Sequence, residues 1–212
     1  MTVSRRTFLK TSAAMTAAAG LVGAPALAFA ESVDIDELLT PGPLGDKVLG
    51  SEDAPVTIVE YASMTCGHCA NFHKRTYPEL KKQYIETGKV KFIFREFPLD
   101  PVAAAAFMLA RSAPADKYFD IIDTMFENQS TWAFSDNPYS SLLNFSKQIG
   151  FTQESFEEAL KNQKLLDAIN AVRERGSNEF KVGSTPTFFV NGEKHAGALP
   201  FDQMSELIDA EL

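Results

Sequence analysis

The sequence is poor in cysteine and histidine, and this scarcity limits the metal sites that it can build. Cys66 and Cys69 are the only cysteines among 212 residues, and the three histidines are His68, His73 and His195. A structural zinc site needs four protein ligands. The spacing Cys66-x2-Cys69-x3-His73 supplies three and leaves the fourth unassigned, so we expect no metal at this cysteine pair.

Positive charge is also scarce. Lysine and arginine number 20 against 28 acidic residues, which gives a net charge of −8. Residues 1–30 hold three of the positive charges and no acid, so the net charge of the remainder is −11. Such an acidic chain is a poor match for nucleic acid or an anionic membrane surface. Internal repeats and low-complexity tracts are absent from the sequence, and 45% hydrophobic residues suffice for one core with an attached sub-domain.

Residues 1–30 lack the leucine and isoleucine content of a membrane span and are interpreted as an export signal. The sequence SRRTFLK at 4–10 resembles the twin-arginine signal, and an alanine-rich stretch follows at 11–27. Small residues allow cleavage after Ala28 or Ala30, and we favour Ala30. A retained anchor is the alternative, which the glycines and proline of the stretch disfavour. We therefore expect a folded protein in an oxidising periplasm, where a dithiol can persist as a disulfide.

Residues 56–69 (VTIVEYASMTCGHC) are the stretch around which we expect the fold to be organised. Its first seven residues are mostly apolar and predict a strand, which only Thr57 and Glu60 interrupt with polar side chains. Strands covered on both faces are typical of α/β sheets. The strand runs directly into a turn that ends in Cys-x-x-C. A strand, this motif and a helix in sequence indicate a thioredoxin-like redox site.

The following segments complete a βαβ unit. A helical pattern extends to Gly88 and contains Pro78, which predicts a kink. A strand over residues 89–97 comes next, and the crossover between the two parallel strands should be right-handed. Before the first strand, we expect a flexible lead-in over residues 31–45 and an edge strand within residues 46–50.

Residues 101–180 are predicted to be helical, with four or five helices. One apolar stripe follows helical spacing without a gap: Tyr118, Ile121, Ile122, Met125 and Phe126. The sheet then resumes at 187–190, where Asn191-Gly192 predicts a hairpin and residues 193–197 return antiparallel. We thus predict a thioredoxin-like α/β fold. Its core comprises residues 46–100 and 181–212, and a helical sub-domain at 101–180 is inserted between the βαβ half and the C-terminal ββα half.

The Cys-Gly-His-Cys sequence has the chemistry that thiol exchange requires. Cys66 is placed at a helix N-terminus, where the helix dipole and free N–H groups favour a thiolate. His68 lies between the two sulfurs and would add to that effect. Cys69 follows one helical turn later and lies deeper, so we assign it as the resolving thiol. A purely structural disulfide is the alternative, but so short a loop gains little stability from it. We expect His73 and His195 to be ordinary, partly exposed histidines.

A proline before the last strand pair is the second notable feature. Pro186 lies in Gly183-Ser184-Thr185-Pro186-Thr187, and proline marks the start of a strand because it cannot occupy a central one. From the sequence alone its peptide bond is open between cis and an ordinary trans turn.

Together these features, over nearly all of residues 46–212, resemble the DsbA family of periplasmic thiol:disulfide oxidoreductases. The Gly-His pair is the one found in protein disulfide isomerase domains, whereas many bacterial DsbA proteins carry Pro-His. The resemblance implies a cis Thr185–Pro186 bond packed against a Cys66–Cys69 disulfide, with the Thr185 backbone pairing with an extended substrate. It also implies that Glu60 is a buried acid that relays the proton of Cys69. The alternative for Glu60 is a surface carboxylate on an edge strand.

Three functions remain open at this point. The first is an oxidase that donates its disulfide to unfolded or reduced exported proteins and is recharged by a quinone-linked membrane partner. The second is a reductase or isomerase, and the third is a non-catalytic binding module. Proteins that carry the Gly-His pair in other settings have a reduction potential of about −180 mV, which is more oxidising than that of thioredoxin at about −270 mV. This difference favours the oxidase.

Residues 31–45 are too short for a dimerisation domain, so we expect a monomer. We also expect no cofactor. Trp132, Phe134 and Tyr139 would either line a substrate groove or, as we favour, pack in the core.

Overall fold

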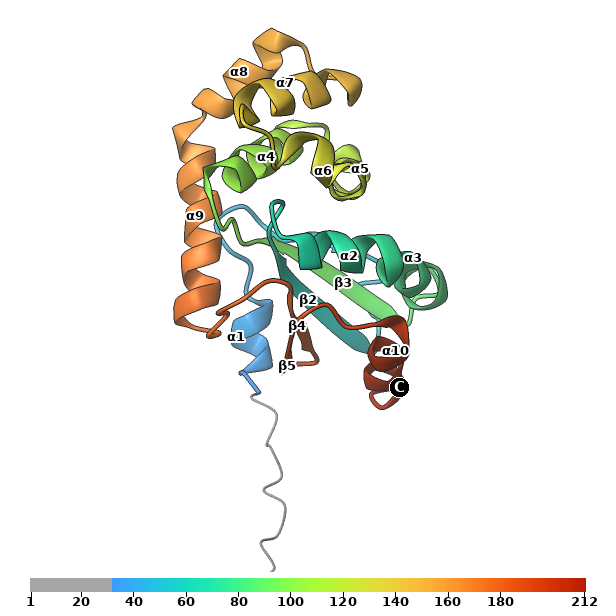
Figure 1. The fold of residues 1–212 in the computed structure, drawn as a ribbon. Helices are drawn as coiled ribbons and strands as arrows, with labels where there is room; N and C mark the ends of the chain where they lie inside the picture. Colours follow the sequence, from blue (N-terminus) through green and yellow to red (C-terminus); the bar gives the residue numbers. More distant parts are fainter. Residues whose placement is uncertain (1–31) are drawn as a thin grey trace, which may run out of the picture.

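The computed structural model describes residues 32–212 (Figure 1). The predicted export signal and its cleavage sites lie outside the described residues. Five strands form one sheet in the order β1-β3-β2-β4-β5. Their bounds are β1 Lys47–Leu49, β2 Val56–Ala62, β3 Val90–Glu96, β4 Thr187–Val190 and β5 Glu193–Ala196.

Strand β2 is the centre of the sheet. It pairs in parallel with β3 and antiparallel with β4, while β1 and β5 form the antiparallel edges. Its side chains alternate between two separate apolar clusters, because successive residues of a strand point to opposite faces. Val56 and Ile58 belong to the larger cluster, and Val59 and Tyr61 to the smaller one. Glu60 lies on the Val56 face and is opposite Phe94 and Phe188 in the register.

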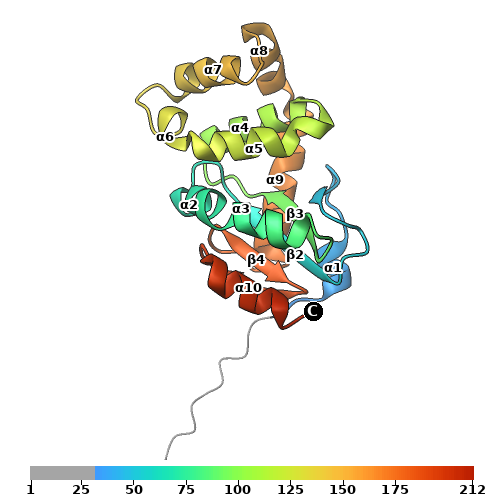
Figure 2. The ribbon, with the colours of Figure 1, turned by 90° about the vertical axis from the view of Figure 1, so that its right-hand side faces the viewer.

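Helices cover both faces of the sheet (Figures 1 and 2). One face carries α2 Gly67–Arg75, α3 Tyr77–Leu80, the π-helical turn η1 Lys81–Ile85 and α10 Phe201–Asp209. The kink expected near Pro78 is confirmed, since α2 ends at Arg75 and Pro78 lies in the first turn of α3. A proline in the first helical turn loses no hydrogen bond that the helix would otherwise make.

The helical insertion runs from β3 to β4. Within the described residues it contains six α-helices, rather than the expected four or five, and one short 3₁₀ turn. The stripe of five apolar residues predicted from Tyr118 to Phe126 is buried, as expected. Helices α4 to α8 lie together beyond α2, whereas α9 extends back to the opposite face of the sheet (Figure 1). The bounds are α4 Pro101–Ser112, η2 Ala115–Lys117, α5 Tyr118–Glu127, α6 Gln129–Trp132, α7 Pro138–Gln148, α8 Gln153–Lys161 and α9 Gln163–Asn178.

Helix α9 approaches the sheet closely at one residue. A Cβ added to Gly176 would lie 2.7 Å from a ring carbon of Tyr61. The Tyr61 ring is itself buried against Phe97, Phe180 and Phe189. Only glycine therefore fits at this contact, which explains a glycine inside a long helix despite its unfavourable helix propensity.

The expected flexible lead-in over residues 31–45 is wrong. Helix α1, Ile35–Leu39, begins at the Asp34 cap and buries Leu38 completely in the smaller cluster. The acidic residues of this segment, and the prolines and glycines that follow, favour a flexible chain. The spacing of Ile35, Leu38 and Leu39 nevertheless places three apolar side chains on one helical face.

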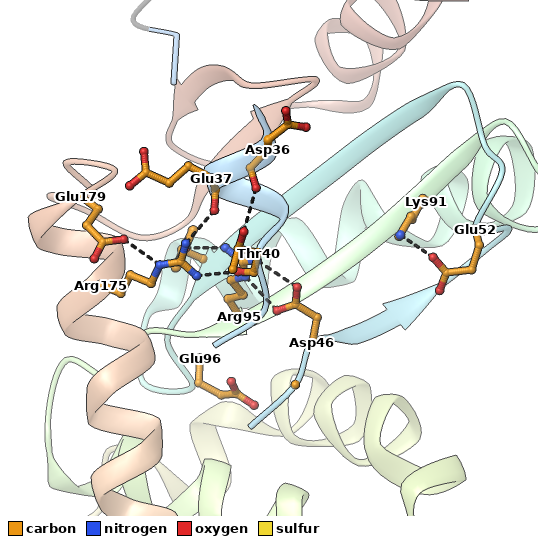
Figure 3. A network of polar contacts seen from close by, with 12 residues as sticks. Asp36, Glu37, Thr40, Asp46, Glu52, Lys91, Arg95, Glu96, Arg175 and Glu179 are labelled. Atoms are coloured by element: carbon orange, nitrogen blue, oxygen red, sulfur yellow. Dashed lines mark hydrogen bonds and ion pairs between the residues drawn. The ribbon is translucent and has the colours of Figure 1, made fainter. Parts of the chain in front are cut away.

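Arginines from the folded core hold this N-terminal segment in place (Figure 3). Arg175 of α9 donates to the carbonyl oxygens of Thr40 at 2.5 Å and Glu37 at 2.6 Å. Arg95 of β3 makes two hydrogen bonds of 2.9 Å to the carboxylate of Asp46. The two Arg175 bonds thus hold backbone carbonyls at the C-terminal end of α1, where a helix leaves its last carbonyls without full helical partners.

A third arginine joins the same segment to the insertion. Arg111 of α4 pairs with the fully buried Glu96 and also donates to the carbonyls of Leu44 and Gly45. The segment before β1 is thus part of the folded core. Within residues 32–212, no helix has the length and apolarity needed to cross a bilayer.

Candidate active site

The two cysteines lie where β2 gives way to α2. Cys66 is the N-cap residue of α2, and Cys69 lies in the first turn of the helix. Both are free thiols in this structure. The backbone N–H of Cys69 donates to the Cys66 sulfur at 3.5 Å, as expected for a cap whose side chain accepts from the first turn. Cys66 keeps 9% of its surface exposed, whereas Cys69 is fully buried.

The surroundings of Cys66 favour its thiolate. Its pKa is lowered to about 5, chiefly by a hydrogen bond from the Cys69 side chain. Burial opposes this shift, and Thr185 together with the backbone N–H groups of Cys69 and His68 supports it. Hydrogen bonds to a charged form lower the pKa of an acid. Cys66 is therefore ionised at neutral pH.

The surroundings of Cys69 act in the opposite direction. Burial, the hydrogen bond to Cys66 and the negative charge of Glu60 raise the pKa of the Cys69 thiol well above its ordinary value. A thiolate is the attacking species in exchange, and a thiol of low pKa is the better leaving group. The geometry thus gives the two sulfurs different chemical properties, with an anion at the slightly exposed Cys66 and a protonated thiol at the fully buried Cys69.

His68 lies between the cysteines, but its side chain is exposed. Within residues 32–212 no hydrogen bond connects its ring to either sulfur, and the backbone N–H is the group of His68 that lowers the Cys66 pKa. The residue's position in the first turn therefore supplies its effect. From the sequence we expected the imidazole to supply it.

The segment around Pro186 approaches the sulfur from another part of the chain. The Thr185–Pro186 peptide bond is cis, and both residues are buried. As a thiol, Cys66 donates to the Thr185 carbonyl oxygen at 3.2 Å. Strand β4 begins directly afterwards at Thr187. Of the two conformations that the sequence left open, the structure contains the cis form.

Glu60 is a buried acid in this structure. Its side chain is fully buried on the central strand, so the alternative of a surface carboxylate on an edge strand is wrong. Its partner is His73, whose Nε2 lies 3.1 Å from Glu60 Oε2. The expectation of a partly exposed His73 is also wrong, because its side chain is 2% exposed. His73 follows Cys69 by one helical turn, so its side chain points to the same buried face of α2.

Gln129 is a further residue of the site, and it was not predicted from the sequence. This residue of α6 is buried, and its amide nitrogen donates to the carbonyl oxygens of Met64 at 2.8 Å and Cys66 at 2.9 Å. The insertion thereby holds the redox turn directly. A single glutamine in a segment without a motif offers no sequence signal for such a contact.

Trp132, Phe134 and Tyr139 were assigned to either the core or a substrate groove, and they differ in their burial. Trp132 is fully buried, and its indole N–H donates to the Met125 carbonyl oxygen at 3.0 Å. Phe134 and Tyr139 are 62% and 52% exposed. The core assignment is thus correct for Trp132 alone. Tyr139 borders an apolar groove together with Val102, Leu142, Phe156 and Leu160.

Comparison with known proteins identifies the family. A family model described as thioredoxin matches residues 44–210. The structure of α-DsbA1 from Wolbachia pipientis superposes with a TM-score of 0.76 at 31% identity, covering 84% of this chain and 95% of that one. The chain belongs to the DsbA family of thioredoxin-like proteins. The predicted fold class is therefore confirmed. BdbD from Bacillus subtilis, with a TM-score of 0.69 over 78% of this chain and 92% of its own, shares the fold at 24% identity.

Two further matches concern activity and location. A Rickettsia felis protein named as a protein-disulfide oxidoreductase is 35% identical over 79% of this DsbA-family chain, which spans 60% of the length of that relative. A model of the twin-arginine translocation signal matches residues 2–22. This match confirms the predicted signal and indicates export to the periplasm.

Proposed function

We propose that this DsbA-family protein is a periplasmic thiol:disulfide oxidoreductase that donates a Cys66–Cys69 disulfide to exported proteins. The observation that carries the proposal is the contrast between the two sulfurs. Cys66 is a slightly exposed thiolate with a pKa of about 5 beside Thr185, and Cys69 is a fully buried thiol whose pKa is raised. A stabilised reduced form makes its disulfide a strong oxidant.

The exchange proceeds in two balanced steps. A substrate thiolate attacks the Cys66 sulfur, the Cys66–Cys69 bond breaks, and Cys69 leaves with the electron pair and takes up a proton. A second substrate thiolate then attacks the substrate sulfur of the mixed disulfide, and Cys66 leaves as a thiolate. Two electrons pass from the substrate to the protein. The low pKa of Cys66 favours the second step because it is the better leaving group.

The neighbouring residues have distinct roles in this proposal. The backbone of Thr185, beside the cis Pro186, would pair with an extended substrate segment and bring its sulfur to Cys66. Glu60 would accept and return the proton of Cys69, since its charge already acts on that thiol. His68 contributes through its backbone N–H.

The partners follow from the same chemistry. Substrates are unfolded or reduced exported proteins, because their thiols are accessible to Cys66. Each turnover leaves the protein as a dithiol, so a membrane oxidase linked to quinone would restore the disulfide. We propose a monomer without a bound cofactor. We also propose that residues 46–100 and 181–212 form the redox core and that 101–180 form an inserted sub-domain.

The decisive experiment measures the reduction potential and the direction of exchange together. The protein is equilibrated with glutathione redox buffers, and the oxidised form is then mixed with an equal amount of a reduced peptide that carries two cysteines. We expect a potential nearer to that of DsbA, about −120 mV, than to that of thioredoxin, about −270 mV, and rapid oxidation of the peptide.

Two variants test the assigned roles. Cys66→Ser should abolish exchange, and Cys69→Ser should accumulate mixed disulfides with the peptide. Equal activity of Cys66→Ser and the wild type would overturn the enzymatic proposal. A potential close to that of thioredoxin, combined with rearrangement of a scrambled substrate, would instead support the reductase or isomerase alternative.

A further inference from the structure

Three charged side chains from three elements meet behind the buried cysteine. Glu60 comes from β2, His73 from α2 and Asp123 from α5 of the helical insertion. His73 Nε2 lies 3.1 Å from Glu60, and its Nδ1 lies 3.5 Å from Asp123 Oδ1. The side chains of Glu60 and His73 are buried, whereas that of Asp123 is 31% exposed. The cluster therefore extends from the core beneath Cys69 to the surface of the insertion.

The rest of the His73 environment is aromatic. Its ring stacks on Phe126 with centroids 4.3 Å apart and contacts the rings of Phe72, Tyr77 and Phe94. Tyr77 of α3 is the remaining titratable side chain beside it, and burial holds that phenol neutral by raising its pKa. Glu60 and Asp123 are thus the charged groups that face the imidazole from the elements packed against it.

The Glu60 carboxyl group is paired with His73. Its Oε1 atom is buried and has no hydrogen-bond partner within the protein, so Oε2 with His73 makes its one polar contact. An ionised carboxylate in an apolar core is costly unless a cation is paired with it. An imidazolium between two carboxylates meets this need, and the pKa of His73 is accordingly raised to about 9 by Glu60 and Asp123 against the effect of burial.

We infer that His73 and Asp123 are positioning residues for proton transfer at Cys69, with Asp123 keeping His73 an imidazolium and His73 keeping Glu60 a carboxylate. The inference rests on the proposed function. In it, the helical insertion controls the redox centre through one side chain of α5. Cys69 and His73 lie one turn apart on the same face of α2, and His73 contacts Glu60 of β2.

The proton transfer occurs when the protein is oxidised by its partner. Cys66 is then in a mixed disulfide, and Cys69 must lose its proton to attack the Cys66 sulfur. The proton passes from Cys69 to the Glu60 carboxylate, the Cys69–Cys66 bond forms, and the partner thiolate leaves with the electron pair. In the reverse direction Cys69 departs as a thiolate and takes the proton back from Glu60. If Glu60 is already protonated, it cannot accept the proton of Cys69, and the attack on the Cys66 sulfur cannot begin by this route.

Asp123→Asn is the variant that tests this inference. It removes the outer charge at a partly exposed position, so the fold should tolerate it. Asp120→Asn is the matched control, because Asp120 lies on the same helix, is 66% exposed and pairs with Lys117 at the surface. Asp123→Glu restores the charge and should restore the wild-type behaviour.

Two measurements are made on the full chain. The first is the NMR titration of the three histidine rings, in which the His73 signal is assigned by its loss in His73→Gln. In Asp123→Asn we expect the His73 midpoint to fall by about one pH unit or more, which is a tenfold change in its proton affinity. The second is the stopped-flow rate at which Cys69 resolves a mixed disulfide of Cys66 with glutathione, from pH 5 to pH 9.

For that rate we expect a loss of about tenfold at pH 7 in Asp123→Asn and a displaced pH profile, because a missing general base typically costs a factor of that size or more. Asp120→Asn and Asp123→Glu should follow the wild type. An unchanged His73 midpoint and rate profile in Asp123→Asn would overturn the inference while leaving the proposed function intact. A wild-type protein unable to resolve the mixed disulfide would instead overturn the proposed function.

Discussion

The amide nitrogen of Gln129 lies 2.9 Å from the carbonyl oxygen of Cys66. The same nitrogen lies 2.8 Å from the Met64 carbonyl oxygen, so one side chain of the insertion bridges the turn that precedes α2. Backbone carbonyls in a buried turn need such partners, because an unsatisfied polar group costs free energy once it leaves water. The redox turn is thus held by a segment more than sixty residues away in sequence.

Replacing Gln129 with leucine should therefore destabilise the protein. The substitution leaves the volume similar but removes both hydrogen bonds, and we expect the free energy of unfolding to fall by about 1–3 kcal/mol. Urea denaturation of the reduced protein provides the measurement. Gln148→Leu, at an exposed position on α7, is the control and should change the midpoint little. Equal midpoints for the two variants would show that the Gln129 contacts contribute nothing.

The acidity of Cys66 offers a second prediction. The Cys69 side chain is the largest cause of its lowered pKa, so Cys69→Ala should move that pKa upward from about 5. His68→Ala should leave it nearly unchanged, since the backbone N–H that contributes is retained. The thiolate absorbance at 240 nm, followed from pH 3 to pH 10, measures both. A large shift of the Cys66 pKa in His68→Ala would show that the imidazole contributes to the acidity of Cys66.

The redox motif and the order of the elements could be predicted because they depend on local patterns. The apolar strand before Cys66, the five-residue stripe of α5 and the Asn191-Gly192 hairpin all follow from periodicity or turn chemistry, and each is present. The cis bond before Pro186 was implied by family resemblance and could not be derived from composition.

The contacts that the sequence did not predict are those between distant segments. In the sequence, His73 is a polar residue within a predicted helix. Only the packing of α5 on α2 shows that Phe126 and Asp123 lie next to its ring. In the sequence, Gly176 is a residue of low helix propensity within a helix, and only the structure shows that the Tyr61 ring packs against it. These pairings depend on tertiary structure, which a single sequence does not encode in any short pattern.

The stability of the reduced protein should depend on pH through Cys66. Its pKa is about 5 in the folded state and about 9 ordinarily. A lowered folded-state pKa stabilises the fold at pH values above the unfolded-state pKa, and this stabilisation is lost as the pH falls towards 5. The oxidised protein has no thiol to titrate. The difference in urea midpoint between the reduced and oxidised forms should therefore shift in favour of the reduced form from pH 5 to pH 8.

Comparison of the two redox forms also removes the contribution of His73. With its pKa raised to about 9, that residue stabilises the fold at low pH, and the effect declines as the pH rises through about 9. Both redox forms contain the same pair with Glu60, so its effect cancels in the difference. A difference that stayed constant from pH 5 to pH 8 would contradict a thiolate at Cys66.

The last prediction concerns the N-terminal segment, which was predicted from the sequence to be flexible. Arg175→Met should release the carbonyls of Glu37 and Thr40 and reduce the free energy of unfolding by about 2 kcal/mol, since hydrogen bonds to a charged donor are among the stronger ones. Limited proteolysis of the exported form should then cut within residues 32–46 sooner than in the wild type. Arg173→Met, an exposed arginine on the same helix, serves as the control. If both variants were cut at the wild-type rate, the arginine would not be what holds α1 against α9.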